Sequence, residues 1–236
     1  MKNIIAKNTI LNVSIISLIG LFSLAANAAE GDPVSSESWG SPIATFSNVS
    51  LGSGTEGIDI SASFAGYLGG LYQYQLEVAS KQDLEHYEVN YLLLNTASES
   101  GVSIESTWSE DVEFDNENGR GDIEFEDINT ANIGLFSKLS FPDARVHAYP
   151  RMGVGYMWGE DILETTYVEF EIPVLFNIND MLWVGATPTY LHSMEGVEID
   201  EFTGIIEAGA KLSETFGVSV SVNDDEEFLG RVIFAF

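Results

Sequence analysis

The sequence predicts an all-β protein, an antiparallel up-and-down transmembrane β-barrel of about twelve strands, with ten or eight strands as alternatives. Three observations predict this fold. The chain starts like a secretory signal peptide, and the remainder alternates apolar and polar residues with a period of two. The connections between these segments alternate between short and long. After residue 24, no apolar run approaches the roughly 20 residues that a membrane helix needs.

The first residues have the three parts of a secretory signal peptide. Lys2 and Lys7 give a positive start, Ile10–Leu24 is mostly apolar without charge, and Ala26–Ala28 (Ala-Asn-Ala) fits a small-residue cleavage site. The alternative is an uncleaved membrane anchor, but the polar sequence that follows argues against it. We expect residues 1–28 to be removed and the mature chain to work outside the cytoplasm.

A period of two runs through the rest of the chain. In one example, Val168, Phe170 and Ile172 alternate with Glu169 and Glu171. This alternation is typical of a strand with one apolar and one polar face. It gives eleven candidate strands, at residues 56–66, 69–79, 85–95, 100–108, 123–140, 145–158, 165–178, 181–192, 202–212, 215–223 and 226–236.

A weaker twelfth candidate strand is Ile43–Leu51. A secreted N-terminus and a last strand that ends at the level of the short turns place both chain ends on one side of the membrane, which requires an even strand count. We therefore place the barrel at residues 43–236. Residues 29–42, which include Pro33 and Pro42, are expected to form a flexible N-terminal lead.

The connections alternate in length and charge. The short ones are expected at residues 67–68, 96–99, 141–144, 179–180 and 213–214. The longer, acidic ones are expected at residues 109–122, 159–164, 193–201 and 224–227. Short turns on one side and long polar loops on the other are typical of barrels in which the loops face the cell exterior.

The two faces of the strands differ in charge. The apolar faces of the eleven strands carry no Asp, Glu, Lys or Arg, leaving aside residues 123–127, whose register the pattern does not set. We predict that the polar faces line a lumen in which charged groups are partly desolvated and need partners. The expected lumen charges are Asp59, Glu77, Glu88, Glu105, Lys138, Arg145, Arg151, Glu169, Glu171, Glu207, Lys211 and Arg231. Lys138, Arg145 and Lys211 are expected near the short turns.

Two segments resemble known barrel sequences. The last residues, Phe228–Phe236, end on Phe with apolar residues at alternate positions, and Ala148–Tyr156 is similar to the "PYxGxGxGY" strand of small barrels with Tyr and Pro inverted. The end of the chain resembles the C-terminal insertion signal of Gram-negative outer-membrane β-barrels, with Phe234 and Phe236 as its aromatic positions. This resemblance implies a monomer in the outer-membrane lipid, inserted by the barrel assembly machinery.

Composition excludes several function classes. The net charge of −28 argues against binding nucleic acid, and the absence of cysteine excludes thiolate chemistry. The histidines His86, His147 and His192 have no metal-ligand spacing, so we expect no metal site, no cofactor and no catalytic residues. The acidic loops are candidates for loose binding of divalent cations.

The function expected from these patterns is that of a narrow or side-chain-plugged barrel with acidic extracellular loops, in a structural or surface-interaction role. Trp183, which falls on a polar face, is a candidate to plug the lumen. The first alternative is a small diffusion channel that prefers cations, because an acidic mouth attracts them. The second is an outer-membrane hydrolase with a rim site near His192, where Ser193 and Glu195 are the local candidates. We expect that the protein is not an enzyme.

Overall fold

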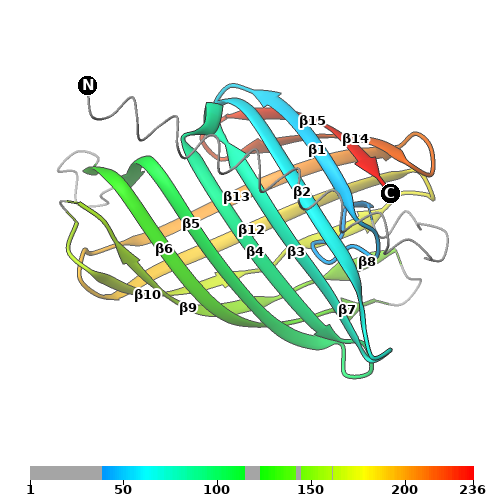
Figure 1. Cartoon of the computed structure of the whole chain (residues 1–236), viewed down its shortest axis with the longest axis horizontal. Helices are drawn as coiled ribbons and strands as arrows, with labels where there is room; N and C mark the ends of the chain where they lie inside the picture. Colours follow the sequence, from blue (N-terminus) through cyan, green and yellow to red (C-terminus); the bar gives the residue numbers. More distant parts are fainter. Residues whose placement is uncertain (1–38, 115–122, 142–144, 161) are drawn as a thin grey trace.

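The protein is a closed antiparallel barrel of 12 strands (Figure 1). The computed structural model describes residues 39–114, 123–141, 145–160 and 162–236, and it describes no side chains between residues 111 and 126. The predicted signal peptide and residues 29–38 of the predicted lead lie outside this range. The sheet closes because the first and last strands pair, with Asn48 opposite Ala235. The predicted fold class and strand number are therefore confirmed.

Fifteen ladder segments form these strands. They are β1 (Asn48–Gly54), β2 (Gly57–Leu68), β3 (Tyr72–Lys81), β4 (His86–Asn95), β5 (Ser100–Phe114), β6 (Ile123–Ser137), β7 (Leu139–Ser140), β8 (Val146–Ala148), β9 (Arg151–Trp158), β10 (Thr165–Glu171), β11 (Val174–Asn177), β12 (Leu182–Glu195), β13 (Asp200–Lys211), β14 (Phe216–Asn223) and β15 (Phe228–Ala235). A single helical turn, η1 (Gln82–Leu84), follows β3.

Three strands are interrupted, which explains fifteen segments in a barrel of 12 strands. Lys138 separates β6 from β7, Pro150 lies between β8 and β9, and Pro173 lies between β10 and β11. Proline has no N–H to give to a ladder, so the ladder breaks beside it. Each proline carbonyl still accepts a bond from the preceding strand: Pro150 from the Ser137 amide at 3.1 Å, and Pro173 from the Tyr149 amide at 2.8 Å.

The two ends of the barrel differ in their connections. The end that holds the C-terminus, here called the turn end, has the connections at residues 69–71, 96–99, 141–145, 178–181 and 212–215. The opposite loop end has the connections at residues 55–56, 82–85, 115–122, 159–164, 196–199 and 224–227. Part of the predicted long loops is strand, since β5 continues to Phe114 and β12 to Glu195. Hydrogen bonds to neighbouring strands extend β5 and β12 beyond the ends that the alternating sequence pattern predicts.

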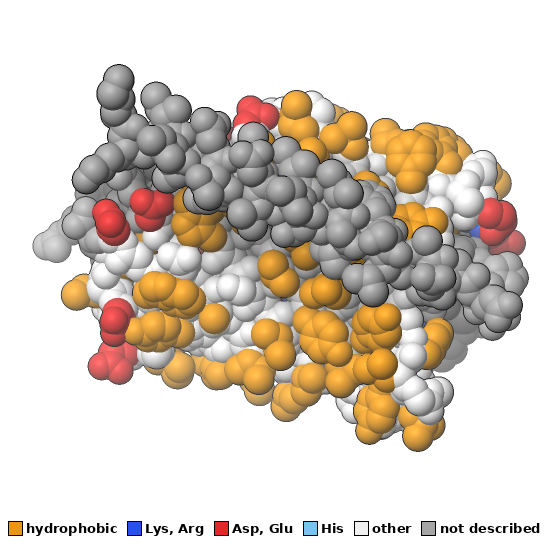
Figure 2. All heavy atoms as spheres, viewed as in Figure 1, with side chains coloured by type: hydrophobic (Ala, Val, Ile, Leu, Met, Phe, Trp, Pro, Cys, Tyr) orange, Lys and Arg blue, Asp and Glu red, His pale blue; other side chains and the backbone are white. Residues whose placement is uncertain are grey.

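The outer surface is apolar between the two ends. Leu135 is 63% exposed, and Ile206 is 63% exposed on the other side of the barrel. In Figure 2, hydrophobic side chains cover the middle of the visible wall, and acidic side chains gather at its ends. An apolar belt flanked by polar ends suits a barrel surrounded by lipid. In the described part of the chain, no helix is long and apolar enough to span a membrane.

The interior is filled at the turn end by the chain's own N-terminal residues. Residues Trp39–Ser47, here called the luminal segment, lead into β1 and lie at the end of the barrel that holds the C-terminus (blue, Figure 1). Trp39, Ile43 and Phe46 are buried against wall residues in one apolar cluster. Residues 39–42, the described part of the predicted flexible lead, are therefore packed, and the first strand starts at Asn48 rather than at Ile43. Apolar side chains gain more from burial in the lumen than from exposure to water.

Candidate functional site

The lumen is the candidate functional site, and its centre is a cluster around Arg151. The Arg151 guanidinium contacts Glu105 on β5 at 2.9 Å, and Glu169 and Glu171 on β10 at 2.7 Å each. Asn132 on β6 donates a further bond to Glu169 at 3.2 Å. These residues share the inward face because opposite partners across a ladder point to the same side. A planar guanidinium with five donors can serve several carboxylates at once.

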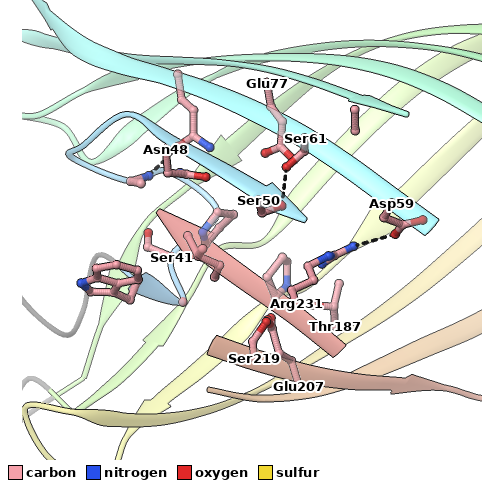
Figure 3. A pocket seen from close by; sticks show the side chains of 18 of the residues that line it. Ser41, Asn48, Ser50, Asp59, Ser61, Glu77, Thr187, Glu207, Ser219 and Arg231 are labelled. Carbon is pink, nitrogen blue, oxygen red and sulfur yellow. Dashed lines mark hydrogen bonds and ion pairs between the residues drawn. The ribbon is translucent and has the colours of Figure 1, made fainter. Parts of the chain in front are cut away.

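Two further ion pairs lie in the lumen. Lys81, at the end of β3, contacts Glu88 on β4 at 2.5 Å. Arg231 on β15 contacts Asp59 on β2 at 3.4 Å (Figure 3). Together with the Arg151 cluster these pairs form a charged zone, here called the luminal belt. Sequence analysis omitted Lys81, although it has the same strand parity as Glu77.

The remaining predicted lumen residues divide into two groups. Glu77 and Glu207 line a cavity beside the luminal belt. Lys138, Arg145 and Lys211 are found at the turn end, as expected from the sequence, and outside the luminal belt. Lys211 contacts Glu214 in the adjoining turn at 2.9 Å, and Arg145 is exposed just before β8. The luminal belt thus has more carboxylates than bases.

A cavity of about 300 Å³ lies between the luminal segment and the strands of the barrel seam. Figure 3 shows its labelled side chains, with Ser50 and Asp59 on one side and Glu207 and Ser219 on the other. Ser50 and Ser61 form a hydrogen bond of 2.8 Å across this wall. Polar side chains are the larger part of the lining, and most of them are hydroxyl or carboxyl groups, so the cavity suits polar contents.

The luminal segment is held at the turn end by backbone hydrogen bonds from two buried glutamines on β3. The Gln73 side-chain amide donates to the Ile43 carbonyl at 3.3 Å and to the Ala44 carbonyl at 2.8 Å. The Gln75 side-chain carbonyl accepts from the Ala44 amide at 2.5 Å. Buried backbone groups need such partners, and here side chains of the wall provide them.

Two buried tryptophans, Trp39 and Trp183, belong to the same apolar cluster as the luminal segment. Trp183 on β12 is 1% exposed, so the residue singled out as a candidate plug is indeed packed inside. A Cβ atom at Gly209 would lie 2.0 Å from the Trp183 ring, and one at Gly217 would lie 2.5 Å from the Trp39 ring. The glycines of β13 and β14 therefore create the space that the two indoles fill.

A second apolar cluster closes part of the loop end. Ile162 and Ile199, from two loop-end connections, are buried against Met157 and Tyr167 of the wall. A Cβ atom at Gly155 would lie 2.1 Å from the Tyr167 ring, so this glycine of the "PYxGxGxGY"-like segment is needed for packing. Along β9 and β10, the Arg151 cluster lies between the two apolar clusters.

The geometry does not support a hydrolytic site at His192. Consecutive strand residues point to opposite faces, so His192 and Ser193 on β12 point away from each other. The Ser193 hydroxyl accepts from the Ile199 amide at 2.8 Å, which is a structural bond. The His192 ring lies 3.8 Å from the Asp200 carboxylate, which is long for an ion pair, and both side chains are about half exposed. Among the described residues there is no group of three side chains suited to a metal ion.

The solved structures that resemble this chain include outer-membrane channels and porins. The chain is similar to the "COG4313 outer membrane channel from Pseudomonas putida F1", with a TM-score of 0.55, 6% identity, and coverage of 89% of this chain and 100% of that chain. The NanC porin matches with a TM-score of 0.52, 7% identity, and coverage of 80% and 98%. The fold is that of a Gram-negative outer-membrane β-barrel. At these identities the likeness concerns the fold alone. No protein-family model matches the sequence, and a sequence comparison with curated proteins gives no match.

Proposed function

We propose that this chain is an outer-membrane barrel whose lumen is closed to diffusion, and that it serves a structural or surface-interaction role. The observation that carries the proposal is the luminal segment, in which Ile43 and Ala44 are each 4% exposed inside the turn end. The partial closure of the loop end by Ile162 and Ile199 supports it. A barrel filled in this way resembles a packed protein core more than a water-filled pore.

The proposal also fixes an orientation. The turn end faces the periplasm, and the loop end faces the exterior with the acidic residues Glu56, Asp83, Glu160, Glu198 and Asp224. The apolar wall contacts lipid, the monomer is inserted by the barrel assembly machinery after signal-peptide cleavage, and the outward-facing Phe234 and the terminal Phe236 belong to the insertion signal. No catalytic step is part of this function.

Single-channel recording tests the closed lumen. The mature protein is refolded, shown to be inserted by its resistance to protease, and recorded in a planar bilayer. The expected result is silence or rare brief openings. Steady conductance by folded protein would refute the proposal.

A second function, a diffusion channel that prefers cations, is favoured by one observation. The lumen holds Asp59, Glu77, Glu88, Glu105, Glu169, Glu171 and Glu207, against Lys81, Arg151 and Arg231 in the same region. An excess of fixed negative charge attracts cations and repels anions. In a recording with a salt gradient, this function predicts a cation-selective reversal potential.

A further inference from the structure

We propose that the turn end of the lumen is a peptide-binding site, that the luminal segment is its built-in ligand, and that displacement of this ligand opens a cation-preferring path. This inference rests on the proposed closed lumen and adds its regulation. The ligand class is a short, bent peptide with an aromatic residue near each end, as in Trp39–Ser47.

The first argument is that the barrel does not use the luminal segment for its closure. Strand pairing between β1 and β15 runs from Asn48 opposite Ala235 to Gly54 opposite Leu229. Residues 39–46 take part in no ladder. Ser47 is tied to the wall, because its carbonyl accepts from the Phe236 amide at 3.0 Å and its hydroxyl accepts from the Ala65 amide at 3.1 Å. Residues 39–46 can therefore leave the lumen while Ser47 stays in place and the sheet stays intact.

The second argument is the form of recognition. Gln73 and Gln75 bind backbone groups of the segment rather than its side chains. The Trp39 ring occupies the space above Gly217 and lies 4.9 Å from the Phe46 ring. Hydrogen bonds to the peptide backbone combined with pockets for aromatic anchors are a common way for proteins to bind short peptide segments.

The third argument is the polarity of the wall behind the segment. Gln73, Gln75, Ser63 and Asn177 are buried there, and a permanently dry core would use apolar residues at such positions. Within the described part of the chain, the Ser63 hydroxyl and the Asn177 side-chain carbonyl lack a hydrogen-bond partner while the segment is in place. Polar groups at these positions are suited to contact with water once the segment leaves.

The fourth argument is what lies above the segment. The cavity has Gly40, Pro42 and Phe46 among its lining residues, so the luminal segment, which lies at the turn end, forms part of the cavity wall. The carboxylates of Glu77 and Glu207 line the same cavity. Withdrawal of the segment would join the cavity to the turn end and expose a passage with acidic walls.

The test uses the full mature chain in a planar bilayer. Trp39→Ala removes the main anchor, and the double variant Gln73→Ala/Gln75→Ala removes the backbone bonds. Each is expected to raise the open-channel fraction at least tenfold with cation selectivity. Thr107→Ala is the matched control, because Thr107 is a luminal residue that bonds Thr130 at 2.7 Å, away from the segment.

A synthetic peptide with the sequence of residues 39–47 then probes the site directly. Added on the turn-end side of the Trp39→Ala protein, it is expected to restore closure, whereas a scrambled peptide is not. A single Ile43→Cys is the second readout, since the chain has no native cysteine. Its thiol should resist a water-soluble reagent in the otherwise native chain and react at least tenfold faster when Trp39→Ala is added.

The outcomes separate the two proposals. If the wild type conducts steadily, the closed-lumen function is refuted, and the comparison with Trp39→Ala still decides the inference. If folded Trp39→Ala and Gln73→Ala/Gln75→Ala conduct no more than the wild type, the segment is a fixed part of the wall and the inference is overturned. If the variants conduct but both peptides act alike, the turn end is no peptide site and the inference is also overturned.

Discussion

Replacing Arg151 by Met should destabilise the barrel more than any other single charge removal. The Arg151 side chain is 13% exposed, and it contacts Glu105, Glu169 and Glu171, which are 11–20% exposed. Methionine keeps much of the volume but leaves three carboxylates close together without their base. Uncompensated charges in a partly dry interior are costly because neither water nor a partner stabilises them.

The magnitude follows from the class of interaction. Removing one partner of a buried ion pair costs about 3–5 kcal/mol. Arg151→Lys should cost less, about 1–3 kcal/mol, because one ammonium keeps the charge but cannot copy the contacts at 2.9 Å on one nitrogen and 2.7 Å on the other.

The assay is equilibrium unfolding in urea of the refolded barrel in detergent or lipid, followed by tryptophan fluorescence. Arg145→Met is the matched control, since Arg145 is exposed at the turn end and its loss should change the unfolding free energy by less than about 0.5 kcal/mol. Replacing the three partner glutamates by glutamine together with Arg151→Met should recover most of the loss. Equal stability of Arg151→Met and Arg145→Met would refute the view that the luminal belt supports the fold.

Three other outcomes are expected. Gly209→Ala should destabilise the barrel by about 1–3 kcal/mol in the same urea assay, because its Cβ would lie 2.0 Å from the Trp183 ring, whereas Gly204→Ala, with nothing within 4 Å, should be neutral. Phe236→Ser should lower the amount of barrel assembled in cells severalfold without changing the stability of refolded protein; normal assembly would contradict its role as an insertion signal. Calcium at millimolar concentration should raise the unfolding free energy by less than about 1 kcal/mol. Sodium chloride of equal ionic strength should reproduce most of this rise, because both salts act mainly by screening the repulsion between acidic groups at the loop end. A rise specific to calcium would indicate a true calcium site.

The strands and their register were predictable because one physical constraint acts at every second residue. Lipid on one side forces apolar side chains such as Ile133 and Val154 outward, and the opposite parity then points inward. The expected twelfth strand was also found, as β1, and its start differs because Ile43 is needed inside the lumen. Alternation carries no information about such an inward turn.

The filling of the lumen was less predictable, for the same reason. The pattern of Ile43, Ala44 and Phe46 predicted a weak strand. In a single sequence, an apolar residue that fills the lumen cannot be distinguished from one that faces lipid. Trp183 was the exception: a large aromatic residue on the polar face requires space opposite it, which Gly209 provides. Lys81 was missed because it ends its strand, where parity is hardest to assign.

The position of the luminal belt bears on the proposal that a closed lumen can become a path. A fully apolar filling would be more stable than ion pairs, because the desolvation of charges opposes their attraction. Between the clusters of Trp183 and Tyr167, however, the chain places Arg151 with three glutamates, and it places Glu77 and Glu207 beside a polar cavity. These groups gain from water. On the proposed function, the closed state would therefore depend most on the apolar contacts of the luminal segment at the turn end, where a small change in binding would decide between a filled barrel and an open one.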